Sequence, residues 1–221
     1  MLPGIPVLLV ATRNHGKLME LTPMIEAAGY RALSLDDAGI AEDSQEDGLE
    51  AFDTFEENAL AKAQYFYARA GGIAVLADDS GLVVDALHGE PGVRSKRWSG
   101  SRTSGAGLDA ENNAKLLSVL LNEADRQARF VCVAAIVSAT GVRFARGENS
   151  GRILERASGT GGFGYDPLFW SDGLGKTFAD ATLEEKSQVS HRARAVAAVL
   201  LRSAARDTGV AIAVDRAGAG R

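Results

Sequence analysis

The chain has 221 residues, of which 46% are apolar and 24% are charged, and this balance excludes an intrinsically disordered protein. The net charge of −5 excludes a global basic field for duplex nucleic acid, and no apolar run is long enough for a membrane helix, so we expect neither partner. The single cysteine, Cys132, excludes an internal disulfide framework and a cysteine-based zinc finger, and it fits a reducing cytoplasm.

The first part of the chain predicts a strand, a helix and a second strand. Residues 5–11 form a continuous apolar run that is typical of a buried strand. Apolar residues at helical spacing follow from Gly16 and end at Gly29, and residues 30–35 predict the next strand. This order favours a parallel arrangement, and the acidic residues 36–50 are expected to form a loop.

The next segment predicts a capped helix and a short strand. Thr54 and Glu57 match a capping box, so a helix is expected from Thr54 to about residue 70. Residues 73–77 predict a strand that ends at the polar turn 78–81.

After this turn, residues 82–87 predict another strand, and residues 88–107 are expected to be irregular. Asp109 is expected to cap a helix that continues to about residue 121. Residues 129–139 and 142–147 flank a Thr-Gly pair that is typical of a hairpin, and residues 151–157 are expected to add a third antiparallel strand.

The last part of the chain predicts a loop and two helices. Residues 158–166 form a glycine-rich loop, Thr182 and Glu185 match a second capping box, and the final helix is expected from Ser190 or His191. The pattern is that of a mixed α/β fold without a linker. We therefore expect one domain over residues 1–212 and a flexible tail over residues 213–221.

Four motifs contain residues that suit chemistry. The first is the turn 11–17, which joins the first strand to the first helix and ends in Gly16-Lys17. A turn before a helix offers backbone N–H groups to phosphate, and Lys17 adds a positive charge. The P-loop signature fails here because Ala11 and Leu18 replace its first glycine and its hydroxyl residue. The alternative is a polar turn with a solvated lysine.

The second motif is Asp78-Asp79-Ser80-Gly81. Adjacent carboxylates suit a hard cation or a general base, although the same residues also make an ordinary turn. The acidic residues before the first capping box could supply another metal ligand, and otherwise they are solvated surface. These candidates are Glu42, Asp43, Glu46 and Asp47.

The third and fourth motifs suit a base. The glycines of residues 159–164 allow a ligand to approach the backbone closely, and Phe163 and Tyr165 offer faces on which a base can stack. The following proline excludes a dinucleotide-binding helix, and a glycine-rich hairpin turn is the alternative. His191 and Arg192 can donate to a keto oxygen, which an exocyclic amine cannot replace, or they can simply be solvated.

In combination and in this order, the motifs resemble the inosine triphosphate pyrophosphatase family over residues 7–202. The resemblance depends on VLLVATRNHGK, TFEENALAKA, ADDSGLVVDAL, GEPGVRSKRWSG, GTGGFGYDPLF and EEKSQVSHR. It implies an elongated α/β fold with a mixed sheet, flanking helices and two lobes around a central cleft, and commonly a homodimer. It also implies Mg²⁺-dependent hydrolysis of non-standard purine triphosphates, namely ITP, dITP and XTP, to the monophosphate and pyrophosphate.

The resemblance also implies roles for single residues. Asp79 corresponds to the proton acceptor and to a metal-associated carboxylate, and Glu46 fits the second metal ligand. Substrate contacts are implied for Thr12, Arg13, Asn14, His15, Gly16, Lys17, Ser80, Phe163, Gly164, Tyr165, Asp166, Lys186, His191 and Arg192.

Two other functions stay open from the sequence. One is a pyrophosphatase of related fold that acts on other modified nucleotides. The other is a nucleotide-binding regulator without turnover, against which the presence of both Asp79 and Lys17 argues.

Overall fold

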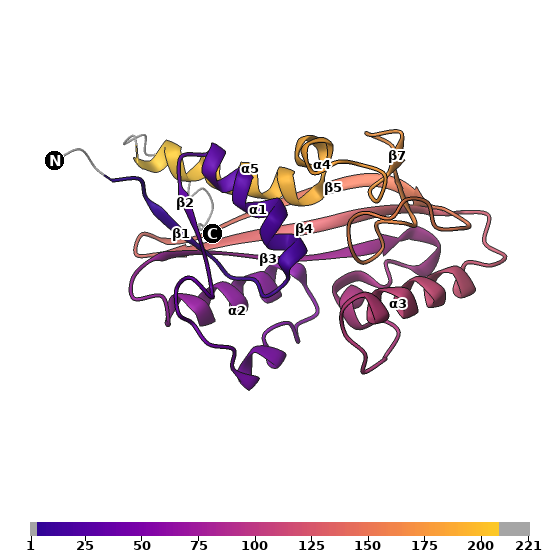
Figure 1. The fold of residues 1–221 in the computed structure, drawn as a ribbon, viewed down its shortest axis with the longest axis horizontal. Coiled ribbons are helices and arrows are strands. Elements are labelled where there is room, and N and C mark those ends of the chain that lie inside the picture. Colours follow the sequence, from indigo (N-terminus) through magenta and orange to yellow (C-terminus); the bar gives the residue numbers. More distant parts are fainter. Residues whose placement is uncertain (1–3, 208–221) are drawn as a thin grey trace, which may run out of the picture.

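The computed structural model describes residues 4–207, which form one seven-stranded sheet in the order β2-β1-β3-β4-β5-β6-β7. Figure 1 shows the sheet along the long axis of an elongated molecule, with α1, α4 and α5 on one face and α2 on the other. The predicted mixed α/β class with flanking helices is therefore confirmed.

The predicted parallel unit is present at one end of the sheet. Strand β1 (Val7–Val10) leads into α1 (His15–Ala27) and then into β2 (Arg31–Ser34), which pairs with β1 in parallel. Strand β3 (Ala74–Val84) lies parallel to β1 on its other side. The Asn14 side chain begins α1 by accepting a hydrogen bond from the Lys17 N–H at 3.0 Å.

The remaining strands are antiparallel. They are β4 (Gln127–Ser138), β5 (Gly141–Ile153), β6 (Phe169–Ser171) and β7 (Lys176–Thr177), and the predicted hairpin joins β4 to β5. The third antiparallel strand predicted over residues 151–157 is wrong, because residues 151–153 still belong to β5. At Gly151 the backbone of Trp170 in β6 approaches too closely for any side chain, so the glycine serves strand pairing.

The predicted break at residues 78–81 is also wrong. These residues lie inside β3, which pairs with β4 without interruption from Val75 to Val84. Gly81 is needed because the backbone oxygen of Gly92 and the Ser95 hydroxyl fill the space where its Cβ would lie. The Ser95 hydroxyl also accepts the Leu82 N–H at 2.8 Å, which fastens this part of β3 to the following segment.

The longer helices begin close to their predicted caps, with one exception. They are α2 (Phe55–Tyr67), α3 (Gly105–Val119), α4 (Leu183–Val189) and α5 (His191–Asp207), and three short 3₁₀ helices are η1 (Ser44–Gly48), η2 (Asp85–Leu87) and η3 (Gly92–Arg97). Thr54 and Thr182 accept the capping hydrogen bonds of α2 and α4. Asp109 does not cap α3, which begins four residues earlier; its carboxylate accepts a hydrogen bond from Gly164 instead.

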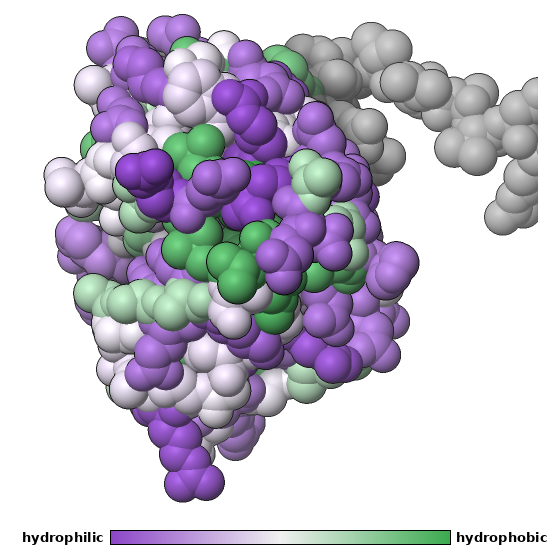
Figure 2. All heavy atoms as spheres, turned by 90° about the vertical axis from the view of Figure 1, so that its right-hand side faces the viewer, coloured by the Kyte–Doolittle hydropathy of each residue, from purple (hydrophilic) through white to green (hydrophobic). Residues whose placement is uncertain are grey.

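Two cores cover the two faces of the sheet, and a third fills its far end. Successive residues of β1 alternate between the faces, so that Leu9 packs against α2 and Leu8 packs against α1 and α5. The third core packs Leu116 and Leu120 beside three phenylalanines, Phe130, Phe169 and Phe178. Figure 2 faces this end of the molecule and shows apolar side chains gathered among hydrophilic ones.

Two predictions concern residues that lie wholly or partly outside the described range 4–207. The flexible tail predicted over residues 213–221 lies outside the described residues, and the single domain over 1–212 stays a prediction. In the part of the chain that the structure describes, no helix is long and apolar enough to cross a membrane.

Candidate active site

A cavity of about 420 Å³ opens between segments that lie far apart in the sequence. Its walls come from the turn before α1, the acidic segment around η1, α2, β3, η3, α3, β4, the glycine-rich loop, α4 and the start of α5. All of the predicted site residues line it except His15 and Gly16. The cavity corresponds to the predicted central cleft.

The turn before α1 is folded by its own side chains. The Thr12 hydroxyl accepts the Asn14 N–H at 3.1 Å, and Asn14 in turn accepts the Lys17 N–H. Gly16 faces the glycine-rich loop, since a Cβ at this position would lie 2.6 Å from the ring of Phe163. Thr12 and Asn14 therefore present the helix N-terminus and Lys17 to the cavity.

The Arg13 side chain binds the acidic segment around η1. Its guanidinium donates to both carboxylate oxygens of Glu46, at 3.1 and 2.8 Å, and to the backbone oxygen of Ile40 at 3.0 Å. The hydrogen bond from Arg13 lowers the pKa of Glu46. Glu46, predicted as a metal ligand, is thus already paired with Arg13.

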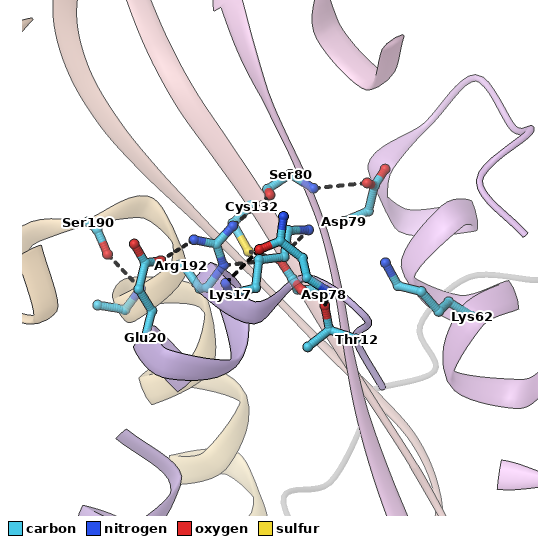
Figure 3. Close-up of polar contacts among 12 residues, drawn as sticks. Thr12, Lys17, Glu20, Lys62, Asp78, Asp79, Ser80, Cys132, Ser190 and Arg192 are labelled. Carbon is cyan, nitrogen blue, oxygen red and sulfur yellow. Dashed lines mark hydrogen bonds and ion pairs between the residues drawn. The ribbon is translucent and has the colours of Figure 1, made fainter. Parts of the chain in front are cut away.

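Asp78 and Asp79 point to opposite sides of β3, as neighbouring residues of a strand do (Figure 3). Asp78 is buried and forms ion pairs of 3.1 Å with both Lys17 and Arg192. Burial raises the pKa of Asp78, but the charges of Lys17 and Arg192 outweigh it and leave this pKa far below its ordinary value. Asp78 is therefore ionised at neutral pH.

The pKa of Asp79 is shifted in the opposite direction, above its ordinary value. Burial raises its pKa to about 6, although Lys62 and Lys17 lower it, and the negative charge of Glu50 raises it further. Its two oxygens accept hydrogen bonds from the Asn58 amide at 2.9 Å and from the Ser80 N–H at 3.0 Å. A carboxylate held in place with a pKa close to neutrality can take a proton, which is what a general base requires.

Two residues beside Asp79 were not predicted. Lys62 on α2 forms an ion pair of 2.5 Å with Glu50, and both line the cavity. Burial raises the pKa of Glu50, but Lys62 and Lys17 lower it to about 2. Lys62 could have been found because it follows Asn58 by one helical turn on the same face of the capped helix.

The other side of β3 carries a chain of buried charges of alternating sign. Arg192 donates to Asp78 and Glu20, and its third nitrogen donates to the Ser80 hydroxyl at 2.9 Å. Lys186 continues the chain to Glu20 at 2.6 Å and to Asp166 at 2.9 Å. Glu20 was not predicted, although it lies one turn after Lys17 on α1. In order, the chain is Lys17, Asp78, Arg192, Glu20, Lys186 and Asp166.

His191 lies beside this chain and stays neutral. Its ring stacks on Phe130 with 4.7 Å between centroids, and burial and the charges of Arg192 and Lys186 lower its pKa well below the ordinary value. Its Nδ1 is buried and, within the described residues, has no hydrogen-bond partner. A neutral imidazole carries one donor and one acceptor, so His191 can recognise a polar edge without adding charge.

The two aromatic residues of the glycine-rich loop have different environments. Tyr165 is buried, and its hydroxyl donates to the backbone oxygen of Ser95 at 2.9 Å, so its ring belongs to the core rather than to an open stacking face. Phe163 is half-buried, and the cations of Lys186 and Arg192 lie 5.4 and 5.8 Å from its centroid. Of the two faces predicted for a base, Phe163 is the one that stays partly open.

No cluster of three or more His, Cys, Asp or Glu side chains that could hold a metal occurs in residues 4–207. Asp79 and Glu50 nevertheless lie close enough for the charge of Glu50 to raise the pKa of Asp79. Mg²⁺ in proteins is commonly held by one or two carboxylates together with substrate phosphates. Lys62 contacts one oxygen of Glu50, whereas Arg13 engages both oxygens of Glu46, so Asp79 and Glu50 fit such an ion better than Glu46.

The fold and this cavity define an α/β protein suited to a ligand that is both phosphorylated and aromatic. Comparisons with known proteins give the same class. The model of the Ham1 family matches residues 8–201. The dITP/XTP pyrophosphatase of Geobacter sulfurreducens is 49% identical over 86% of this chain and 92% of its own length, and that of Mycolicibacterium paratuberculosis is 50% identical over 86% and 91%.

Comparisons with solved structures give the same class of protein. The Ham1 protein of Staphylococcus aureus has a TM-score of 0.75 at 35% identity, covering 90% of this chain and 99% of its own. A structure described as a nucleoside-triphosphatase / dITP/XTP pyrophosphatase from Mycobacterium abscessus has a TM-score of 0.65 at 43% identity, covering 88% and 98%. The chain belongs to the Ham1 family, which confirms the resemblance indicated by its motifs.

Proposed function

We propose that this chain, a nucleoside triphosphate pyrophosphatase, hydrolyses dITP and XTP, and also ITP, to the monophosphate and pyrophosphate. The names of its close relatives support the first two substrates. The observation that carries the proposal is Asp79, a carboxylate with a pKa of about 6, beside Lys62 and Lys17 in a cavity whose other side holds Phe163 and His191.

In the proposed reaction, Asp79 takes a proton from the attacking water. The water oxygen forms a bond to the α-phosphorus, the bond from that phosphorus to the bridging oxygen breaks, and pyrophosphate leaves. Asn58 and the Ser80 N–H keep the Asp79 carboxylate oriented. Lys17 and Lys62 bind phosphate oxygens and offset the charge that develops on them.

We also propose that the reaction uses Mg²⁺, with Asp79 and Glu50 as the residues that would hold it. When bound, such an ion supplies Lewis-acid stabilisation of phosphate oxygens. Glu50 takes the place of the predicted Glu46 in this proposal, because Arg13 engages both oxygens of Glu46.

Base choice is assigned to His191 and Arg192. Arg192 has five N–H groups, of which three are used by Asp78, Glu20 and Ser80, so two stay available for a keto oxygen. The 6-amino group of adenine would present a donor to the donors of Arg192. The buried polar groups would then stay unpaired, which is costly. A 6-oxo purine is therefore preferred to adenine.

The test is a turnover assay of dITP, XTP, ITP and the four common triphosphates, with and without Mg²⁺, that detects pyrophosphate. We expect dITP, XTP and ITP to exceed ATP in kcat/KM. Asp79→Asn should lower kcat by about 10²- to 10⁴-fold, the usual scale of lost acid–base catalysis. Turnover at the wild-type rate in this variant would remove Asp79 from the reaction.

The same assay separates the other functions. Preference for a pyrimidine or another modified nucleotide would favour a related pyrophosphatase, and tight ITP binding without any product would favour a regulator. The cytoplasmic location expected from the single cysteine and the homodimer that the resemblance implies stay predictions, and sedimentation of the purified chain tests the second.

A further inference from the structure

The tip of the glycine-rich loop is held by two side chains of α3. The Gly164 N–H donates to the Asp109 carboxylate at 2.8 Å, and the Gly164 carbonyl accepts from the Asn113 amide at 2.9 Å. Asp109 and Asn113 are one helical turn apart on the same face of α3. Both backbone polar groups of Gly164 are therefore fixed by this helix.

Gly164 has the left-handed backbone conformation, with φ of +62°. This conformation is unfavourable for most residues other than glycine. The neighbouring Tyr165 is tied by its hydroxyl to the backbone oxygen of Ser95, which also accepts from Asn112 of α3. The loop thus rests on a frame formed by α3 and η3, of which α3 carries the two side chains that fix Gly164.

The residue before Gly164 is Phe163, whose ring lies between the two functional ends of the cavity. The ring is within 5.4 Å of Lys186 and 5.8 Å of Arg192, and it faces the backbone of Gly16 in the turn before α1. Any movement of Gly164 moves Phe163 directly, because the two residues share a peptide bond. Asp79, Lys62 and Glu50 have no contact with this loop in the described hydrogen bonds and ion pairs.

We infer that Asp109 and Asn113 are positioning residues for base recognition: by fixing Gly164 they set the place of Phe163 and so the affinity for the purine, without acting on the phosphate end. This inference rests on the proposed function and assigns a part of it to α3. It predicts that loss of either side chain weakens binding of the base-bearing product selectively.

The experiment measures binding of the two reaction products separately by calorimetry in Mg²⁺ buffer, with IMP as the probe of the base end and inorganic pyrophosphate as the probe of the phosphate end. Asp109→Ala and Asn113→Ala should each weaken IMP by about tenfold, the effect of losing one hydrogen bond to an ordered group. Pyrophosphate affinity should stay within about twofold of the wild type.

Two further variants distinguish positioning from general damage to the helix. Asp109→Asn keeps an oxygen that can accept the Gly164 N–H, so it should restore most of the IMP affinity. Glu111→Ala removes an exposed acid from the same helix, and it should leave both affinities unchanged. In turnover assays, Asp109→Ala should raise KM for dITP with little change in kcat.

Unchanged IMP affinity in both alanine variants would overturn the positioning role and leave the proposed function standing. Equal losses of IMP and pyrophosphate affinity would also overturn it, because they indicate a general defect. A wild-type protein that binds no purine monophosphate would overturn the inference together with the proposed function.

Discussion

The two sides of β3 place consecutive carboxylates in opposite electrostatic environments. On one side, Asp78 belongs to a chain in which each buried charge lies next to charges of the opposite sign. On the other, burial raises the pKa of Asp79 to about 6, because Lys62 and Lys17 offset it only in part and the charge of Glu50 adds to it. The comparison teaches that a carboxylate whose burial is balanced by ion pairs builds the site, while one whose burial is left unbalanced has a pKa suited to proton transfer.

The balanced side connects elements that are distant in sequence. Its six charges come from α1, β3, the glycine-rich loop, α4 and α5, so the ion pairs fix how these elements meet. The cost of burying such charges is large and is repaid only when every partner is present. Substitution in this region is therefore expected to lower stability, in addition to any effect on substrate binding through Lys17 or Arg192.

The largest expected effect breaks the balanced side. Arg192→Met keeps much of the side-chain volume but leaves Asp78 and Glu20 buried without their shared partner. We expect a loss of about 3–5 kcal/mol in the free energy of unfolding, measured by denaturant titration. Arg194→Met is the matched control, since Arg194 is exposed on the same helix. A loss below about 1 kcal/mol would show that the chain of charges contributes little.

On the unbalanced side, removing the charge should stabilise the protein while it lowers activity. The pKa of Asp79 rises from an ordinary 3.8 to about 6, so folding disfavours its carboxylate form. This cost is absent below about pH 4, grows as the pH rises, and is complete above about pH 6. Asp79→Asn should therefore gain up to about 3 kcal/mol near pH 8 and nothing near pH 4.

Thermal unfolding of both proteins across this pH range measures the gain. An Asp79→Asn variant that is less stable than the wild type at pH 8 would contradict the raised pKa. It would indicate instead that the hydrogen bonds from Asn58 and Ser80 stabilise the carboxylate more than burial penalises it.

The titration of Asp79 should also appear in the pH dependence of the reaction rate. Because the base must be deprotonated, kcat/KM should fall about tenfold per pH unit below about pH 6 and level off above it. Burial and the charge of Arg192 lower the pKa of His191 well below its ordinary value, which moves its titration away from that of Asp79. A profile of kcat/KM from pH 4.5 to 8 checks this, and a flat acid side would exclude Asp79 as the titrating group.

The smallest expected effect is on the Mg²⁺ dependence of activity, and it compares two glutamates of the acidic segment. Glu50→Gln should raise the Mg²⁺ concentration needed for half-maximal activity by about tenfold, the lower end of the effect of losing a metal-associated group. Glu46→Gln, the matched control, should leave this concentration unchanged while it loosens the segment held by Arg13. The reverse result would restore Glu46 as the metal ligand.

Much of the fold could be predicted from local sequence. The caps at Thr54 and Thr182, the hairpin at residues 140–141 and the turn before α1 are all formed by residues close in sequence, so short-range signals suffice. The motifs also indicated the family, and the structure brings most of the predicted site residues to one cavity.

The sequence by itself determined these local elements and the chemical types present in the site. Only the tertiary structure decided that β3 continues through Asp78–Gly81 and thereby turns the two aspartates to opposite sides. Turn propensity at this segment is local, whereas pairing with β4 and the close approach of Gly92 at Gly81 involve residues further along the chain. The pairing of Glu20 with Arg192 and the use of Asp109 on Gly164 likewise follow from contacts between distant parts of the chain, whereas Lys62 had a local signal in its helical spacing from Asn58.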